Sequence, residues 1–318
     1  MDVLSDLLFR AHAADAQVRQ LIHPPPWSMT YADAPSLTLV ATLRGPASVR
    51  LPGADATTRL EAGDVALISR TARYTIADSP DTPEQYIIRN GHKYIAGADE
   101  VPADHAGVAG RTFGADSPEA SIMLRGAYDL RGDVAARLLD MLPELVVVPA
   151  GSRTAPVLEL LTREARLTDP GQDAVLRRLL DLLLVVALRE WCAHGDASLP
   201  AWCRALADPA IGNALHLLHE HPELPWTVGK LAAEVGMSRA MFAARFAAVV
   251  GEPPISYLTN WRMTLAADQL RDTTTPIATV AKNVGYHDPF AFSVAFKRAR
   301  NATPSSWRRG NRAAGATV

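Results

Sequence analysis

The feature that most constrains this chain is a pattern that occurs twice near its C-terminal end. Residues 231–246 read L-A-A-E-V-G-M-S-R-A-M-F-A-A-R-F, and residues 280–296 read V-A-K-N-V-G-Y-H-D-P-F-A-F-S-V-A-F. Each copy predicts a short helix that ends at Val-Gly, a tight turn, and a second helix that carries a pair of Phe residues on one face. A helix, a short turn with Gly and a second helix form the helix-turn-helix pattern. The sequence therefore predicts two helix-turn-helix units in an all-α C-terminal domain.

Both turns carry residues suited to end one helix and begin the next. Gly236 and Gly285 stand where a helix C-terminus favours a left-handed residue. Ser238 and Asp288 are suited to cap the second helix of each copy. Residues 254–270 predict one connecting helix of about 25 Å between the copies, at a rise of about 1.5 Å per residue. Helical hairpins are common in all-α proteins, so one copy would favour DNA binding only weakly, whereas two joined copies favour it strongly.

The distribution of charge supports a nucleic-acid partner. The chain of 318 residues has a formal charge of −2, but from Asp208 onward it holds 12 Lys and Arg against 8 Asp and Glu. From Ile277 to the end these counts are 7 and 1. A basic end on an acidic body is typical of a protein that binds nucleic acid, although a solvated charged surface would give the same counts.

The first third of the chain predicts a different architecture. Short segments rich in Val, Ile, Thr and Tyr alternate with Gly- and Pro-containing turns, and they predict strands at 36–43, 47–51, 64–68, 74–77 and 85–88. Strands at this spacing predict an antiparallel β-barrel or sandwich. After Asp129 the apolar residues recur at three- and four-residue intervals, which predicts helices. The fold class predicted is α+β and multidomain, with an antiparallel β-barrel over 1–130, a helical linker and possible dimerisation region over 131–206, an all-α domain with the two helix-turn-helix units over 207–310 and a disordered tail over 311–318.

These motifs resemble the AraC/XylS family of transcription regulators. From about Pro209 to Arg309 the chain contains G-M-S-R-x-x-F-x-x-R-F, G-E-P-P-x-x-Y-L-x-x-W-R-M, and V-G-Y-x-D-x-x-A-F-x-x-A-F-K-R followed by T-P-S-S-W-R-R. The front is similar to the cupin-type effector domain of a subgroup of that family, most clearly in L-E-A-G-D-V-A-L-I-S. The resemblance implies a one-component, sequence-specific transcription regulator that binds double-stranded DNA and responds to an unknown small-molecule effector or to stress. It also implies RNA polymerase as a further partner. Activation is one role that the resemblance implies, and the sequence leaves repression open as the alternative.

The resemblance further implies two recognition helices, 238–249 and 289–298, that enter successive major-groove segments on one face of the DNA. Their Phe pairs predict the buried side. The positions that the resemblance assigns to base contacts are Ala240, Ala243, Ala244, Pro289, Ser293 and Val294. The full predicted DNA-facing set is Ser238, Arg239, Ala240, Ala243, Ala244, Arg245, His287, Pro289, Phe290, Ser293, Lys297 and Arg298, and Lys297, Arg298, Arg308 and Arg309 are expected along phosphates. Several of the base-facing groups are apolar rather than the long polar side chains that usually read bases. Apolar groups can still contact thymine methyls, but the base preference cannot be read from this sequence.

A metal-dependent cupin enzyme fused to a DNA-binding module is the alternative from another functional class. Catalytic cupins hold a metal through His residues and a carboxylate, yet the strand 36–43 contains no His, and Tyr74 stands where a late His ligand is expected. The remaining front histidines, His12, His23, His92 and His105, lie in predicted loops without metal-ligand spacing. We therefore predict a non-enzyme without a cofactor or metal. The cluster H-L-L-H-E-H (216–221) is interpreted as a solvated helix end rather than a zinc site.

Assembly and location are predicted from the middle and the start of the chain. The segment 173–191 is apolar around most of its circumference, through Leu176, Leu179, Leu180, Leu183, Leu184 and Val186, so it favours either a homodimer contact or burial against the barrel. The first residues lack a signal peptide pattern, and the longest apolar run is too short to span a bilayer, which predicts a cytoplasmic protein with no membrane partner. A redox switch between Cys192 and Cys203 is a hypothesis; packed cysteines are the commoner outcome.

Overall fold

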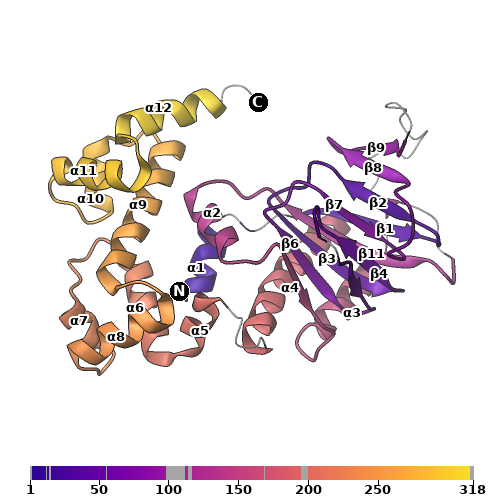
Figure 1. Cartoon of the computed structure of the whole chain (residues 1–318), viewed down its shortest axis with the longest axis horizontal. Helices are drawn as coiled ribbons and strands as arrows, with labels where there is room; N and C mark the ends of the chain where they lie inside the picture. The colour runs from indigo at the N-terminus through magenta and orange to yellow at the C-terminus, as the bar shows by residue number, and fades with distance from the viewer. Residues whose placement is uncertain are drawn as a thin grey trace. The chain divides into compact units, whose positions relative to one another are not determined.

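The computed structural model describes residues 2–11, 13, 16–54, 56–97, 112–113, 117–167, 169–194 and 200–315. The chain divides into two compact units that do not follow sequence order. One unit contains Ala13–Leu130 and Leu142–Gly195, and the other contains Met1–His12, Arg131–Met141 and Asp196–Val318. The range 131–206 predicted as one linker is thus divided between the two units. We call the first of these units the sheet unit and the second the helical unit. The colours of Figure 1 follow residue number and so show which segments of the chain make up each unit.

The sheet unit contains two six-stranded sheets. The first has the strand order β10 (Thr112–Phe113), β1 (Gln17–His23), β11 (Ser121–Tyr128), β3 (Leu37–Arg44), β6 (Val65–Ser69) and β12 (Leu145–Val148). The second has the order β5 (Thr58–Leu60), β4 (Ala47–Arg50), β7 (Tyr74–Ala77), β2 (Ser28–Tyr31), β8 (Tyr86–Arg89) and β9 (His92–Ile95). The five strands predicted from alternation are confirmed as β3, β4, β6, β7 and β8, each within about one residue.

The prediction of a closed β-barrel is wrong for the part of the chain that the structure describes. Each strand pairs only within its own sheet, so no hydrogen-bonded strand joins the two sheets into a ring. A single apolar cluster contains residues from both sheets, among them Val40, Ile68 and Met123 from the first and Met29, Tyr74 and Ile76 from the second. The strands therefore bury their apolar faces by packing sheet on sheet rather than by closing one sheet on itself.

The leucine-rich helix is largely a core element of the sheet unit. It forms α4 (Gln172–His194), beside α3 (Ala155–Glu164). Leu176, Leu180, Leu183 and Leu184 are fully buried, and a Cβ atom on Gly126 of β11 would lie 3.4 Å from the Leu180 side chain. Burial within the unit thus accounts for most of the face that predicted a dimer contact. Leu160, Val175 and Leu182 remain exposed on the two helices.

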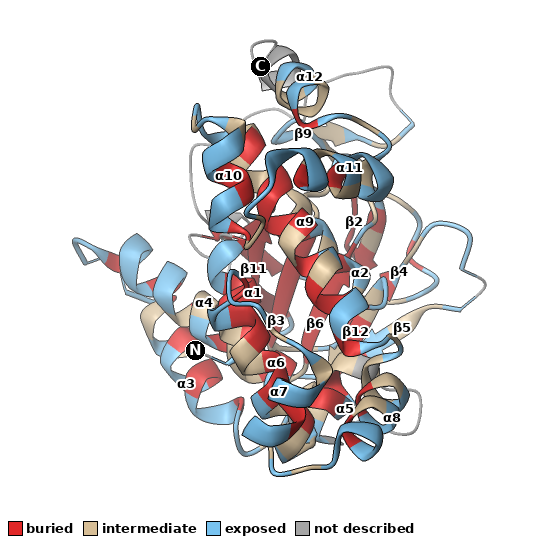
Figure 2. Ribbon diagram, turned by 90° about the vertical axis from the view of Figure 1, so that its left-hand side faces the viewer, coloured by how far each residue is buried: buried red, intermediate tan, exposed pale blue. Residues whose placement is uncertain are grey.

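The helical unit contains α1 (Val3–Arg10), α2 (Asp133–Asp140), α5 (Ala201–Ala207), α6 (Pro209–Glu220), α7 (Val228–Glu234), α8 (Arg239–Val250), α9 (Pro254–Asp272), α10 (Ile277–Asn283), α11 (Pro289–Arg300) and α12 (Pro304–Gly315). The predicted connecting helix is confirmed as α9, which has 19 residues and buries side chains along its length, including Trp261 (Figure 2). Residues 311–315, predicted as a disordered tail, continue α12, and 316–318 lie outside the described residues.

Two further findings concern membrane-spanning helices and the two cysteines. None of the helices in the described ranges is long and apolar enough to cross a membrane. Cys203 is buried in α5, and neither it nor Cys192 is a free thiol.

Candidate nucleic-acid interface

The first helix pair, α7 and α8, is capped by its own sequence. The Thr227 hydroxyl accepts a hydrogen bond from the Lys230 N–H at 3.1 Å at the start of α7. Gly236 has φ +66° after that helix, in the left-handed region. The Ser238 hydroxyl then accepts from the Met241 N–H at 3.3 Å and begins α8. The predicted turn and cap are confirmed.

The second pair, α10 and α11, repeats this arrangement. The Asp288 carboxylate accepts from the Phe290 N–H at 2.9 Å and the Ala291 N–H at 3.2 Å, so it satisfies two donors of the first turn of α11. Gly285 has φ +82°. A Cβ atom there would lie 2.6 Å from the Glu223 carbonyl oxygen, so both the backbone conformation and the close approach require Gly.

The predicted buried face of each pair is confirmed. Phe242 and Phe246 in α8 and Phe292 and Phe296 in α11 are all fully buried. The ring centroids of Phe242 and Phe246 lie 5.6 Å apart, and those of Phe292 and Phe296 lie 5.7 Å apart. The Phe246 ring then meets Tyr257 edge-on at 5.9 Å, and the Phe296 ring meets Trp307 at 6.0 Å. Aromatic packing thus fixes which side of each helix faces outward.

The outward face of α8 is mostly apolar, and Arg239 is an exposed cation on it with no ion pair in the described ranges. Ser238, Arg239, Ala240 and Ala244 are exposed, and Ala243 is half-buried. The predicted DNA contact Arg245 is exposed, but its guanidinium donates to the Asp208 carboxylate at 2.7 Å. That carboxylate also caps α6. The sequence prediction missed Met241, which is 55% exposed at the first turn of α8.

The outward face of α11 combines large apolar groups with cations. Phe290 and Val294 are exposed, and His287, Pro289, Lys297 and Arg298 lie on the same solvent-facing surface of the segment. Ser293 is half-buried, and its hydroxyl donates to the Pro289 carbonyl at 2.8 Å. No ion pair holds Lys297 or Arg298 within the described ranges, so both charges are available to a polyanion.

The other two predicted phosphate contacts differ from each other. Arg309 is exposed. Arg308 is half-buried, and its guanidinium donates to the Thr275 carbonyl, which ties α12 to the segment before α10. Arg308 therefore has a structural contact that the sequence pattern did not reveal.

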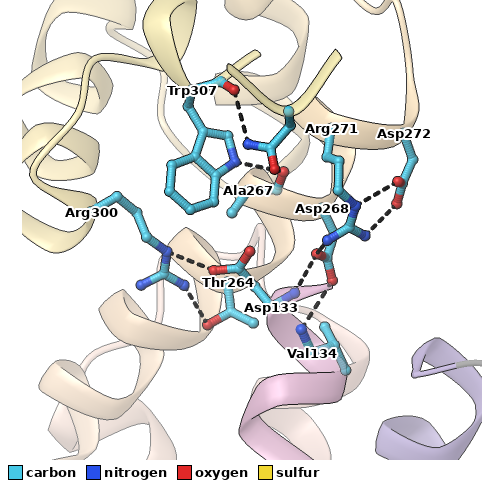
Figure 3. A network of polar contacts seen from close by, with 10 residues as sticks. Asp133, Val134, Thr264, Ala267, Asp268, Arg271, Asp272, Arg300 and Trp307 are labelled. Atoms are coloured by element: carbon cyan, nitrogen blue, oxygen red, sulfur yellow. Dashed lines mark hydrogen bonds and ion pairs between the residues drawn. The ribbon is translucent and has the colours of Figure 1, made fainter. Parts of the chain in front are cut away.

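The last turn of α11 is anchored to α2 through a polar network (Figure 3). Arg300 lies 2.8 Å from the Asp133 carboxylate and donates to the Thr264 hydroxyl at 3.1 Å. Asp268 of α9 accepts from the backbone N–H groups of Asp133 at 2.7 Å and Val134 at 3.0 Å, and so caps α2. These contacts hold α2 against α9.

A second network anchors α1 to α6 and α9. His219 is fully buried, with Nδ1 2.9 Å from the Asp6 carboxylate and Nε2 2.6 Å from the Tyr257 hydroxyl. Burial lowers the pKa of His219, against the opposing effect of Asp6, so the ring is neutral at pH 7. A neutral ring donates from Nδ1 to Asp6 and accepts the Tyr257 hydroxyl at Nε2. The interpretation of 216–221 as a solvated helix end is therefore wrong for His219.

No metal site is evident in the described part of the chain. No group of three or more His, Cys, Asp or Glu residues there is arranged to hold a metal ion. His23, predicted in a loop, ends β1 and is buried beside the Trp27 ring at 5.7 Å. His12 and His105 lie outside the described residues.

Comparison with known proteins identifies the class to which this arrangement belongs. Residues 2–193 match a cupin family, and residues 231–310 match a helix-turn-helix domain family. A Streptomyces antibioticus protein named as an AraC-like transcription regulator is 32% identical over 314 residues, covering 97% of this chain and 99% of that protein. The transcriptional regulator AlkR of Acinetobacter baylyi is 36% identical over 177 residues, which cover 54% of this chain and 58% of AlkR. The DNA-binding domain of AdpA, solved in complex with a target DNA, is 30% identical over 33% of this chain and 95% of that chain, with a TM-score of 0.32.

The chain belongs to the AraC-like transcription regulators and carries an N-terminal cupin domain. It is accordingly a DNA-binding transcription regulator.

Proposed function

We propose that α8 and α11 are the recognition helices of two helix-turn-helix units and that they enter successive major-groove segments on one face of the DNA. The observation that carries this proposal is the repeated geometry. Each helix follows a left-handed Gly, is capped by its own Ser or Asp, and turns a Phe pair inward and its first turns outward. The connecting helix α9 has 19 residues and is about 28 Å long at about 1.5 Å per residue, somewhat shorter than the roughly 34–36 Å of one turn of B-DNA.

Base contacts are assigned to the outward residues of the first turns. In α8 these are Arg239, Ala240, Ala243 and Ala244, and in α11 they are Pro289, Ser293 and Val294. The methyl groups of Ala and Val suit thymine methyls, whereas Arg239 suits the O6 and N7 acceptors of guanine. Met241 and Phe290 add exposed apolar surface at the same ends of the two helices. The interface is therefore expected to favour sites that contain thymine at several positions.

The experiment is selection of binding sites from random DNA by the full-length protein, followed by affinity measurements on the selected site and on single-base variants. Arg239→Ala and Ser293→Ala should each cost about 1–3 kcal/mol on the matched base and relax preference at that position. Arg50→Ala, an exposed arginine of β4 in the sheet unit, is the matched control and should leave affinity unchanged. Equal loss on the selected and scrambled sites for Arg239→Ala would overturn its assignment to bases.

The sheet unit is assigned the role of the regulatory domain, which binds a small-molecule effector. Its support is a cavity of about 490 Å³, within the range usual for small-molecule sites. The protein is proposed to have no enzymatic activity. Metal analysis of the purified protein distinguishes this proposal from the alternative of a metal-dependent cupin enzyme. RNA polymerase remains an expected partner.

Homodimerisation is proposed through the exposed residues Leu160, Val175 and Leu182. The mass of the protein in solution at micromolar concentration tests this proposal, and a monomer would contradict it.

A further inference from the structure

The cavity of the sheet unit has an apolar wall and a charged end. It is bounded by residues of β1, β2, β8, β9 and β11 and by the segment 33–36. The apolar wall includes Leu21, Met29, Ile88 and Ala127. Arg19, Lys93 and Arg125 also line it, together with the carboxylates of Asp33 and Asp129. A ligand that fills this space must therefore offer both an apolar body and a polar group.

Arg125 is the unusual member of this lining, because its charge is buried and no ion pair to a described carboxylate balances it; Asp33 acts on it electrostatically but does not pair with it. Its side chain is only 8% exposed. Its Nε donates to the Tyr74 hydroxyl at 2.7 Å, an outer nitrogen lies 3.5 Å from the Thr38 hydroxyl, and the guanidinium carbon lies 4.2 Å over the Tyr31 ring. No ion pair joins it to a carboxylate among the residues that the structure describes.

The groups that hold Arg125 are neutral at physiological pH. Burial raises the pKa of Tyr31 and of Tyr74 above the usual phenol value, so both remain protonated. A buried cation is costly unless it is paired. The contacts with Thr38, Tyr31 and Tyr74 orient the planar guanidinium but supply no negative charge. An anion in the cavity would complete this site.

The other charged residues of the lining indicate how much negative charge the site accepts. Lys93 lies 3.6 Å over the Tyr86 ring, and a guanidinium nitrogen of Arg19 donates to the Val18 carbonyl at 2.9 Å. Asp33 accepts a hydrogen bond from the Asn90 N–H. Three cations and two carboxylates leave a small positive excess in the lining. That excess suits one negative charge better than the two of a phosphate monoester.

We propose that this cavity binds an organic monocarboxylate, with the carboxylate on Arg125 and a compact hydrocarbon or aromatic body against Leu21, Met29 and Ile88. The planar guanidinium matches a carboxylate geometrically, and charge-assisted hydrogen bonds are the stronger ones in a site shielded from water. This inference rests on the proposed effector role of the sheet unit and names the chemical class of its ligand.

The test is calorimetric titration of the full-length protein with hexanoate and phenylacetate, and with their neutral counterparts 1-hexanol and 2-phenylethanol. Both acids should bind, and each should bind at least about tenfold more tightly than its alcohol. Arg125→Met should weaken binding of the acids about 10- to 100-fold and leave the alcohols little changed. Arg125→Lys, which keeps the charge but loses the planar fork, should lie between them, and Arg50→Met is the matched control outside the cavity.

The outcomes separate the ligand class from the proposed function. Equal binding of alcohols and acids, unchanged binding by Arg125→Met in a folded protein, or no binding of either acid would overturn the proposal. Inorganic phosphate that binds more tightly than both acids would overturn the carboxylate assignment. Thermal unfolding of each variant shows whether the sheet unit is intact, and Arg125→Lys provides the second measurement if Arg125→Met does not fold. DNA binding measured without any probe tests the proposed function on its own, so either can fail while the other stands.

Discussion

The helix pairs α7–α8 and α10–α11 have matching caps and matching Phe cores, but they use their cations differently. On α8, Arg245 is already paired with Asp208 at 2.7 Å. On α11, Lys297 and Arg298 are exposed with no ion pair in the described ranges. The features that the pairs share set their local fold. The pairs differ in how many of their cations are free to contact a polyanion. This difference predicts that the α11 half supplies more of the contacts to DNA phosphates.

The two pairs also differ in the distant segment that supports each of them. Next to the first pair, His219 of α6 bonds both Asp6 of α1 and the Tyr257 hydroxyl of α9. Next to the second pair, Arg300 of α11 is joined to Asp133 of α2. Both α1 and α2 adjoin segments of the sheet unit along the chain. Each half of the DNA-binding region is therefore tied to a segment that continues along the chain into the sheet unit.

The largest expected effect is loss of the aromatic core in either half. Phe246→Ala and Phe296→Ala remove fully buried rings, so each should destabilise the helical unit by about 3–5 kcal/mol. Chemical denaturation followed by the near-ultraviolet circular dichroism of the aromatic residues measures this loss. Val294→Ala, at a 55% exposed position of α11, is the control and should change stability by less than about 0.5 kcal/mol. An intact fold with altered base preference for Phe296→Ala would mean that the two faces of α11 are assigned wrongly.

The next effect concerns the support of the first half. Asp6→Ala removes the buried partner of His219 and Arg10, and should destabilise the helical unit by about 3 kcal/mol. Asp6→Asn keeps a hydrogen-bond acceptor for His219 and should recover part of this loss. The measurement is the midpoint of urea unfolding at pH 7 for both variants. Equal midpoints for Asp6→Ala and the unchanged protein would mean that α1 does not support the first half.

The same network predicts that acid destabilises the helical unit. Burial lowers the folded pKa of His219 below 6.5, so the unfolded chain binds more protons once the pH falls below that value, and stability decreases. For Asp6, burial raises the pKa, but the hydrogen bonds from His219 and Arg10 outweigh it and give a net lowering below 3.8. Its contribution is therefore lost at still lower pH. His219→Gln should flatten the dependence of the unfolding midpoint between pH 7 and pH 5; an unchanged slope would contradict the assignment.

Local sequence predicted the helix pairs because their determinants are local. The left-handed Gly, the capping Ser238 or Asp288 and the Phe pair all fall within about a dozen residues in each copy. The supporting contacts could not be predicted in this way, because Asp6 and His219 lie 213 residues apart and a side-chain pair at that distance leaves no periodic signal. Strand β1 was missed because its last four residues are all buried, so alternation is lost. The exposure of Met241 could have been found from the wheel of α8, where it lies about 100° away from Phe242 and outside the Phe stripe.

A smaller effect should distinguish the support of the second half. Asp268→Ala removes the cap of α2 and a partner of Arg271 at 2.8 Å, and should cost about 1–2 kcal/mol in stability of the helical unit. Asp268→Asn, which can still accept from the α2 backbone, should cost less. Thermal unfolding of the two variants measures the difference. If Asp268→Ala unfolds like the unchanged protein, α2 is not held to α9 by this cap.

The smallest effect tests the difference between the two helix pairs directly. Phosphate contacts release counterions, so each lost contact should lower the slope of log affinity against log salt concentration by about one unit. Lys297→Ala should show this reduction on both a selected and a scrambled site, because a phosphate contact carries no base information. Arg245→Ala should change the slope by less than half as much, since Asp208 already neutralises its guanidinium. Fluorescence anisotropy over a salt series measures both slopes, with Arg50→Ala as the control. Equal reductions for Lys297→Ala and Arg245→Ala would mean that Arg245 leaves Asp208 on binding, and that the two helix pairs hold the DNA backbone alike.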